Sequence, residues 1–313
     1  MRLPRPERID VARVTQAVAS VRESMADTLR TYVIGPDGEE RARTLMETPG
    51  ERWYAEDRPI RRVHADAAMF IGGLRALLLQ SLHPLAMAGV AQHSDYRADP
   101  WGRLQRTADF LAVTTYGPAE MAERTIARIR EVHSRVVGTA ADGRAYSASD
   151  PHLLKWVHVA EVDSFLTAHQ RFGERPLDQA GCDGYVADMA RVAEALGVER
   201  PPRTERELAT QLRAYKRELR STPESRDAAR YLLLTPPLDP PARAAYALLA
   251  AATVATLPAW ARIPLRLPLL PVTERLVLWP LGAAITAGLR WVTAPSSPYR
   301  VDADSRDRAT NAS

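Results

Sequence analysis

The segment that decides the fold is residues 103–138, RLQRTADFLAVTTYGPAEMAERTIARIREVHSRVVG, which contains two successive helical patterns. In its first half, Arg103, Thr107 and Phe110 recur at helical spacing, so one helix face combines an arginine and a hydroxyl with apolar groups. Residues 116–118, YGP, then interrupt the pattern, because proline favours the first turn of a new helix over the interior of the old one. The segment therefore predicts two helices joined by a short turn.

The second of these helices carries the histidine of greatest interest. Ile126, Ile129, His133 and Val136 form one stripe, and Gly138 is expected to end the helix. His133 is therefore expected to point inward. Such a histidine is either a buried core residue with one hydrogen bond or a ligand, and imidazole is a common ligand of haem iron. Spacing alone leaves both interpretations open.

Four blocks of the chain together carry a family resemblance. They are GLRALLLQSLHPLAMAGVAQHSDYR (73–97), GRLQRT (102–107), EVHSRVVG (131–138) and DGRAYSASDPHLLKWVH (142–158). The chain resembles the family that contains the MpaB-type oxygenases and the rubber oxygenase called latex clearing protein. The similarity runs from about residue 64 to 197, and more weakly to 291. It implies an all-α fold, a single multi-helix globular domain that encloses a pocket for haem b.

The resemblance also implies roles for individual residues. His133 matches the proximal ligand of the haem iron and is the expected metal ligand, with the second axial position left open for dioxygen. Arg103 and Thr107 match residues that lie close to the haem, and we assign them as catalytic and cofactor-binding. Arg103 is expected to pair with a haem propionate or a neighbouring carboxylate through its planar guanidinium. Thr107 is expected to form a hydrogen bond in the distal pocket.

Arg106 departs from the pattern of latex clearing protein, which has at this position a lysine that can occupy the distal iron position. A guanidinium stays protonated and cannot ligate iron, so we expect Arg106 on the surface or beside a propionate. His158 and Glu161 lie three residues apart on a predicted helix. Two such residues do not make a metal site, and His158 is instead expected to make a polar contact with the haem or its ligand.

The family implies an oxidoreductase, namely a haem-dependent oxygenase or oxidase. The implied substrates are dioxygen and an apolar small molecule, of an olefinic or isoprenoid kind. Two other classes of function remain open at this point, a haem-binding sensor or carrier without turnover and a haem-free helical interaction protein. The chain contains no GxGxxG, P-loop or GxSxG motif, so common nucleotide and serine hydrolase chemistry lacks sequence support.

Composition limits the possible partners and the compartment. The 42 basic and 38 acidic residues give a formal charge of +4, and the two signs are interspersed, so nucleic acid is not an expected partner. The single Cys182 excludes an intrachain disulfide framework, and no CxxCH motif for covalent haem occurs. The N-terminus is charged where a signal peptide needs an apolar core, which predicts a cytoplasmic location.

The run from His64 to Ser81 is apolar. Gly72, Gly73 and Arg75 interrupt it, and Pro84 follows it, so the apolar stretch is too short to span a membrane. A buried central helix is the prediction. Gly72 and Gly73 weaken such a helix, so a close neighbour is expected there. That neighbour is either another helix or a flat macrocycle.

Other signals outline the remaining chain. Residues 1–10 are a polar lead-in, Asp10 is expected to start a first helix to about Tyr32, residues 11–294 form the domain, and residues 295–313 are a disordered tail. The segment 139–146 predicts a turn between two short extended pieces. Asp150 and Pro151 predict a sharp helix start.

For His93 and for the apolar C-terminal segments, the sequence allows more than one interpretation. His93 is expected to be a turn histidine bonded to nearby aspartates, or else a pocket residue, whereas His83 is expected to be structural. The apolar segments Ala242–Thr256 and Thr273–Trp291 are expected to pack in the core or in an interface between copies of the chain. Peripheral contact with a membrane is the alternative, because both stretches are interrupted.

Overall fold

The computed structural model describes residues 16, 23, 35, 37–94 and 97–293. The elements that build the first half are α2 (Gly38–Glu47), α3 (Pro59–His64), α4 (Met69–Gln80), α5 (Pro84–His93), α6 (Pro100–Tyr116), α7 (Ala119–Arg135), β1 (Val137–Thr139) and β2 (Ala145–Ser147). The second half consists of α8 (Pro151–Phe172), α9 (Gln179–Leu196), α10 (Glu205–Tyr215), α11 (Pro223–Leu234), α12 (Pro240–Thr256), α13 (Ala259–Leu265), α14 (Pro271–Thr273), the π-helical η1 (Glu274–Leu278) and α15 (Trp279–Thr293).

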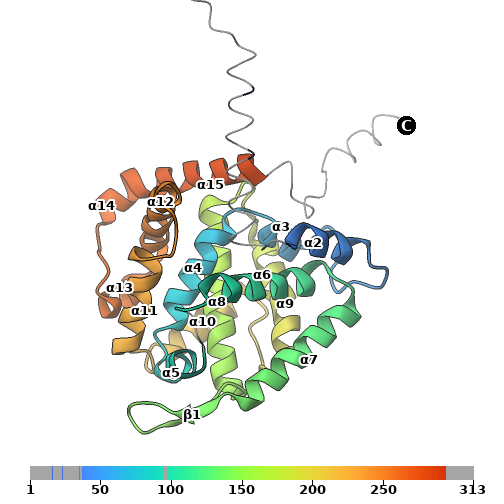
Figure 1. The fold of residues 1–313 in the computed structure, drawn as a ribbon, viewed down its shortest axis with the longest axis horizontal. Coiled ribbons are helices and arrows are strands. Elements are labelled where there is room, and N and C mark those ends of the chain that lie inside the picture. Colours follow the sequence, from blue (N-terminus) through green and yellow to red (C-terminus); the bar gives the residue numbers. More distant parts are fainter. Residues whose placement is uncertain (1–15, 17–22, 24–34, 36, 95–96, 294–313) are drawn as a thin grey trace, which may run out of the picture.

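The predicted all-α architecture is confirmed, with β1 and β2 forming one small hairpin at an edge of the molecule (Figure 1). Its register pairs Val137 with Ser147 and Thr139 with Ala145, as the predicted turn requires. The predicted lead-in, most of the first helix expected between residues 10 and 32, and the predicted tail lie outside the described residues.

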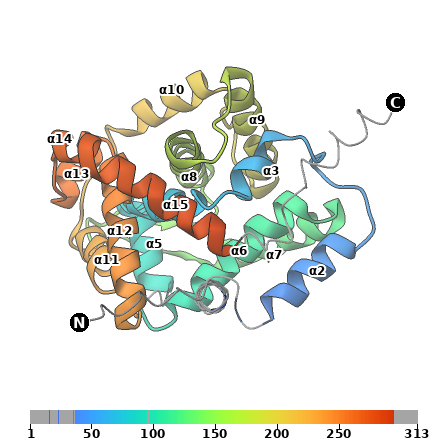
Figure 2. The same ribbon diagram turned by 90° about the horizontal axis from the view of Figure 1, so that it is seen from above.

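Helix α8 lies at the centre of the fold, and it is seen nearly end-on in Figure 2 with other helices around it. Trp156 and Ala160 join an apolar cluster with residues of α4, α10 and α13. Val159 and Phe165 join a second cluster with residues of α3 and α9. Because α8 buries apolar side chains against helices on several of its sides, it forms the centre of the core.

The start of α8 is the one that its sequence predicts. The carboxylate of Asp150 accepts a hydrogen bond of 2.8 Å from the backbone N–H of His152, and Pro151 occupies the first turn. This cap satisfies a backbone donor that has no partner within the helix, and the fixed φ of proline suits the position.

Helix α4 packs along α8 and is the predicted buried central helix. A bend of 105° separates it from α5, so the apolar run is not one straight span. A Cβ atom at Gly72 would lie 2.7 Å from Cδ1 and 3.1 Å from Cα of Phe165. The close neighbour of this glycine is therefore a helix, which decides between the two predicted alternatives.

Arg75 ties three helices together beside this contact. Its side chain is 4% exposed, and its guanidinium donates to Asp163 Oδ2 at 2.7 Å, to Ser164 Oγ at 2.8 Å and to the carbonyl of Thr256 at 3.3 Å. A buried cation is tolerated only when it is paired and hydrogen-bonded in this way. The register of α4, α8 and α12 is thus fixed by charge as well as by packing.

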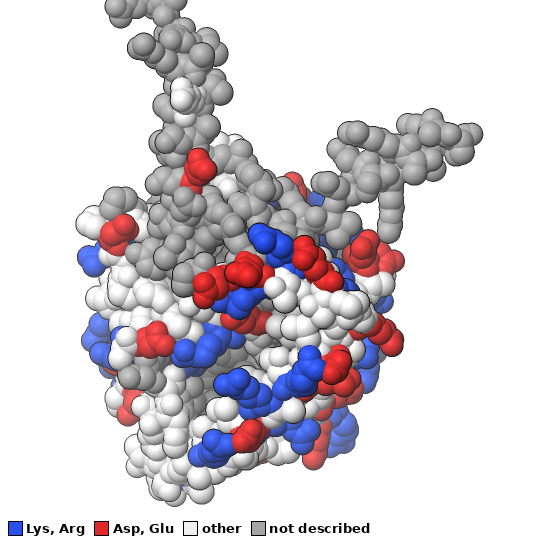
Figure 3. Space-filling model, turned by 45° about the vertical axis from the view of Figure 1, so that its right-hand side comes forward, with Lys and Arg blue, Asp and Glu red and all other residues white. Residues whose placement is uncertain are grey.

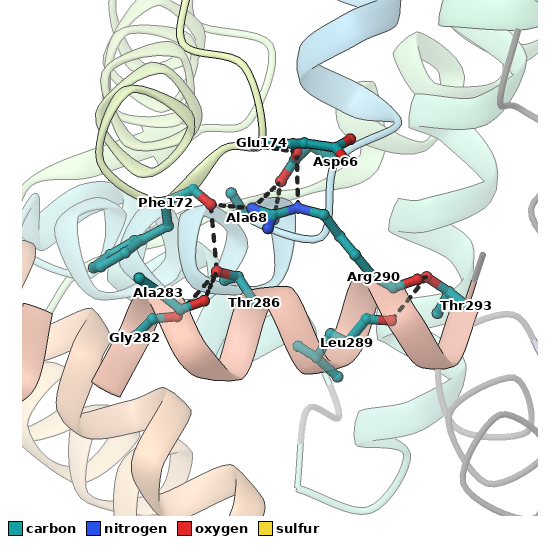
Figure 4. Close-up of polar contacts among 10 residues, drawn as sticks. All are labelled: Asp66, Ala68, Phe172, Glu174, Gly282, Ala283, Thr286, Leu289, Arg290 and Thr293. Atoms are coloured by element: carbon teal, nitrogen blue, oxygen red, sulfur yellow. Dashed lines mark hydrogen bonds and ion pairs between the residues drawn. The ribbon is translucent and has the colours of Figure 1, made fainter. Parts of the chain in front are cut away.

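Helix α15 is held against the end of α8 by polar contacts that Figure 4 shows. Arg290 forms an ion pair with Asp66 at 3.2 Å and donates to the carbonyl of Phe172. Thr286 Oγ1 lies 3.3 Å from the same carbonyl and 3.0 Å from that of Gly282. Since Asp66 precedes α4 and Phe172 ends α8, these contacts join α15 to both central helices.

The C-terminal apolar segments behave differently from each other. Core packing is confirmed for the second half of α12, where Ala252 and Thr253 are buried. Among the described residues, Pro271–Thr293 is long and apolar enough to cross a membrane, and only 17% of its most apolar window is buried. Val272 and Leu276 are 70% and 69% exposed. Core packing therefore does not account for the outer face of this segment.

Charged side chains of both signs are interspersed on the face drawn in Figure 3. Local ion pairs between opposite charges also occur along α7, where Arg124 pairs with Glu120 and Arg135 pairs with Glu131, each one turn apart. This face therefore has no extended patch of one sign, which is the feature that a nucleic-acid surface needs.

The two neighbouring glycines of α4 provide a matched test of the central packing. We expect Gly72→Ala to lower the free energy of unfolding by about 1–3 kcal/mol, because the new methyl group overlaps Phe165 and α8 must move. At Gly73 the nearest atom is 3.9 Å away, so Gly73→Ala should be neutral or stabilise by up to about 1 kcal/mol through helix propensity. Urea denaturation of both variants measures the difference, and equal effects would contradict the packing.

Candidate functional site

A cavity of about 80 Å³ lies among α3, α6, α7, α8 and α9. Most of its lining is apolar, with Phe110 and Leu111 from α6 on one side and Met189 and Val192 from α9 on another. Five polar side chains also reach it, namely His64, Thr114, His133, His158 and Glu161. A mainly apolar hollow with a few convergent polar groups is the usual form of a site for a small molecule or cofactor.

The two helices of residues 103–138 place His133 at this cavity. The Asp99 carboxylate accepts a hydrogen bond of 3.0 Å from the N–H of Gly102 and so caps α6. The predicted break at residues 116–118 then separates α6 from α7. Helix α7 ends at Arg135, which is earlier than predicted, because Gly138 pairs with Tyr146 in the hairpin. His133 lies in the last turn and faces inward, as predicted.

The imidazole of His133 has an unused nitrogen. Nδ1 is buried and has no hydrogen-bond partner among the described residues. Burial also lowers the pKa of His133, so the ring is neutral near pH 7. A core histidine was expected to keep one hydrogen bond, and an unpartnered buried nitrogen in a neutral ring instead favours the ligand interpretation.

His158 and Glu161 approach the cavity from α8, one turn apart. Nε2 of His158 is buried without a partner, and burial lowers the pKa of this histidine to about 4. Burial raises the pKa of Glu161 to about 7, and the carboxyl has no ion pair with a described residue. The cavity therefore contains neutral imidazoles and a carboxyl group that can hold or release a proton near neutral pH.

Sequence reasoning did not identify His64, which ends α3 and also lines the cavity. Its Nδ1 lies 2.8 Å from Thr115 Oγ1 and its Nε2 lies 3.3 Å from the hydroxyl of Tyr185. Burial lowers the pKa of His64 to about 3. Both ring nitrogens are occupied, so this histidine supports the wall and is not free to bind a metal.

Arg103, Thr107 and Arg106 lie on the first half of α6, and none of them lines the cavity. Arg103 donates to the hydroxyl of Ser94, and Thr107 donates to the carbonyl of Arg103 at 3.0 Å. Arg106 is exposed and pairs with Asp99 at 3.2 Å, in line with the expected surface position. The same helix supplies the cavity lining one to two turns later.

His93 is the final residue of α5 and does not line the cavity. Its Nε2 lies 3.1 Å from the carbonyl of Val137 and 3.1 Å from the hydroxyl of Tyr146. His93 thus lies at the helix end that the sequence predicted, and its described contacts are with the hairpin. Asp95, one of the expected partners, lies outside the described residues. The hairpin residues were too distant in sequence to be identified as partners.

The side chains at the cavity are of the kinds that bind a metal or a haem, but the cavity is smaller than a haem. Two imidazoles with unused nitrogens and a carboxyl group are typical ligands and proton carriers. A volume of about 80 Å³ is well below the roughly 300–1,000 Å³ of typical ligand pockets. Any group as large as a haem would therefore require the helices around the cavity to move apart.

Comparison with known proteins identifies the family of the chain. The family described as ER-bound oxygenase mpaB/B'/Rubber oxygenase, catalytic domain, matches residues 61–291. No curated protein and no solved structure gives a significant match to the chain. The match spans the cavity, both central helices and most of α15, so the chain belongs to the mpaB/B' and rubber oxygenase catalytic-domain family and is an enzyme of the oxygenase type.

Proposed function

We propose that this enzyme is a haem b-dependent oxygenase or oxidase and that His133 is the protein ligand of the iron. The observation that carries the proposal is the unpartnered Nδ1 of a neutral His133 beside a mainly apolar cavity. A proximal histidine needs such surroundings, because a neutral ring nitrogen must be available and water must be kept away.

The remaining residues have distinct roles in this proposal. Phe110 and Leu111 exclude water, while Glu161, whose pKa is raised to about 7, provides a buried carboxyl group that can hold or release a proton beside the cofactor. Arg103 and Thr107 lie earlier on α6 and outside the cavity lining, and they would bind the polar edge of the cofactor once the helices around the cavity had moved apart. A haem with one imidazole ligand supplies the redox chemistry that activates dioxygen.

The proposed organic substrate is an apolar small molecule of the olefinic or isoprenoid kind. The apolar lining supports this class, since it offers few partners for a polar substrate. The family description includes a rubber oxygenase, whose named substrate is itself an apolar material. Oxygen consumption that depends on an added olefin would support turnover, and haem binding without any consumption would indicate a sensor or carrier.

The first prediction concerns the iron ligand. We expect His133→Ala to reduce the affinity for haem by at least about 10–100-fold, because loss of even an outer partner of a ligating histidine has this effect. The helical core should remain folded, since His133 is partly exposed in the last turn of α7. The haem absorption of purified protein and its circular dichroism measure both effects.

The control for this prediction is His158→Ala, which removes the other unpartnered imidazole of the cavity. His158→Ala should retain haem. Added imidazole should restore haem binding to His133→Ala, because it replaces the missing iron ligand. Loss of haem in His158→Ala together with normal loading of His133→Ala would transfer the ligand role to His158.

The second prediction compares two arginines of α6. Arg103→Ala should accelerate haem dissociation by about tenfold, as expected for loss of a charge-assisted hydrogen bond. Arg106→Ala should have little effect, because Arg106 is exposed and pairs with Asp99. Transfer of haem to an acceptor protein measures both rates. Equal rates for the two variants would remove the special role of Arg103.

The third prediction uses the raised pKa of Glu161 in the haem-free protein. The folded pKa of about 7 lies above that of an unfolded glutamate, so this carboxyl makes folding less favourable as pH rises between about 4.5 and 7. Glu161→Gln should therefore stabilise the protein at pH 8 and change its stability little at pH 5. Histidine titrations are common to both proteins and cancel in the comparison.

Urea denaturation of wild type and Glu161→Gln at both pH values measures this difference. A stability difference that is the same at pH 5 and pH 8 would show that Glu161 does not titrate in this range.

A further inference from the structure

Two histidines and a glutamate meet at a place that the cavity does not include. His83 lies between α4 and α5, His152 is in the first turn of α8, and Glu218 follows α10. Nε2 of His152 lies 2.8 Å from Glu218 Oε2, and Nε2 of His83 lies 3.5 Å from the same oxygen. One potential ligand atom from each residue lies within 4.8 Å of the other two. We propose that His83, His152 and Glu218 bind one divalent transition-metal ion.

His83 provides an independent sign that a ligand is missing. Its side chain is 1% exposed, and neither ring nitrogen has a hydrogen-bond partner with acceptable geometry among the described residues. The 3.5 Å approach of Nε2 to Glu218 aims the ring at the cluster without forming a hydrogen bond. A buried polar atom without a partner costs about 1–3 kcal/mol, and a metal bond would remove this cost.

A backbone hydrogen bond fixes the segments of His83 and Glu218 relative to each other. The N–H of Arg220 donates to the carbonyl of Leu82 at 2.8 Å. A local bond of 2.8 Å from the N–H of Glu218 to the carbonyl of Tyr215 shapes the turn that carries Glu218. Two of the three ligands are therefore held in place before a metal enters.

Tyr215 also orients His152. The tyrosine hydroxyl donates to the carbonyl of His152 at 2.8 Å, and the same oxygen lies 3.4 Å from His152 Nδ1. In the metal-free protein, the Nε2–H of His152 donates to Glu218 Oε2 at 2.8 Å, and metal binding would displace this proton. In the metal-binding tautomer, Nδ1 would carry the proton and direct it at the Tyr215 oxygen. An outer partner of this kind typically sets the tautomer of a metal-binding histidine. Buried Trp156, whose ring centroid lies 6.3 Å from that of His83, forms the apolar side of the site.

The ligand types indicate which ions the site would take. Two imidazoles and one carboxylate suit Zn²⁺ and also Fe²⁺, whereas Mg²⁺ and Ca²⁺ prefer sets made of oxygen alone. Ligand atoms about 2.1 Å from a tetrahedral Zn²⁺ lie about 3.4 Å apart. Glu218 Oε2 lies 3.5 Å from His83 Nε2 and 2.8 Å from His152 Nε2, so only the second distance would have to lengthen. Three protein ligands leave one position for water. The ion would clamp the α4–α5 loop, the start of α8 and the end of α10.

The site is separate from the proposed haem site, although α8 contributes to both. His152 and His158 are six residues apart, which corresponds to a rise of about 9 Å along the helix. The cavity contains its own pair of histidines and a glutamate, so a binding experiment must distinguish the two places. Variants of His133 and of Glu218 provide this distinction.

Calorimetric titration tests the proposal on the full chain as purified, after treatment with a chelator. Zn²⁺ should bind with one ion per chain and raise the midpoint of thermal unfolding. Glu218→Gln and His152→Ala should each weaken this binding by at least about tenfold, since each removes a ligand atom. Both side chains are about half exposed, so the variants should fold, and circular dichroism checks this.

His93→Ala and His133→Ala are the matched controls. The first removes another exposed imidazole, the second removes one from the cavity, and both should bind Zn²⁺ as the wild type does. An anaerobic titration with Fe²⁺ forms a second arm. Binding of either ion with the stated dependence on Glu218 and His152 supports the site. Binding of neither ion, or binding that only His133→Ala weakens, would overturn it.

Discussion

The close contact between α4 and α8 is the constraint on which the other parts of the structure depend. Gly72 lets the two helices approach until the backbone of Phe165 lies against it, and Arg75 then pairs with Asp163 at the same level. Once α8 is fixed in this way, its side chains point in defined directions. His158 and Glu161 face the cavity beside α7 and α9, and His152 faces the segment that follows α10. A shift of α8 would therefore disturb both places together.

Buried imidazoles without partners lie at both proposed sites. Native chains satisfy nearly all their buried polar atoms, because each exception costs about 1–3 kcal/mol. In the part of the chain that the structure describes, unused nitrogens of His133 and His158 lie at the cavity, and those of His83 lie at the second cluster. His169 on α8 also has two buried ring nitrogens without partners and belongs to neither place. An unpartnered imidazole therefore supports a ligand site only where other ligating or cavity-lining groups accompany it, as they do at both proposed sites.

Sequence patterns predicted local features well where short-range chemistry decides them. Asp150 and Pro151 start α8, and the break predicted at residues 116–118 separates α6 from α7. The end of α7 was predicted too late, because pairing of Gly138 with Tyr146 is a contact between separate segments. His64 was missed for the same reason, since its place at the cavity depends on how α3 packs. The inward direction of His133 followed directly from helical spacing.

The central claim is that the cavity at His133 receives a haem whose iron has one position free for a small ligand. The most direct measurement is the absorption spectrum of the wild-type protein after loading with haem, desalting and reduction, with and without carbon monoxide. We predict about one retained haem per chain and a clear spectral change when carbon monoxide is added. Failure to retain haem, or a retained haem whose spectrum carbon monoxide leaves unchanged, would contradict the account.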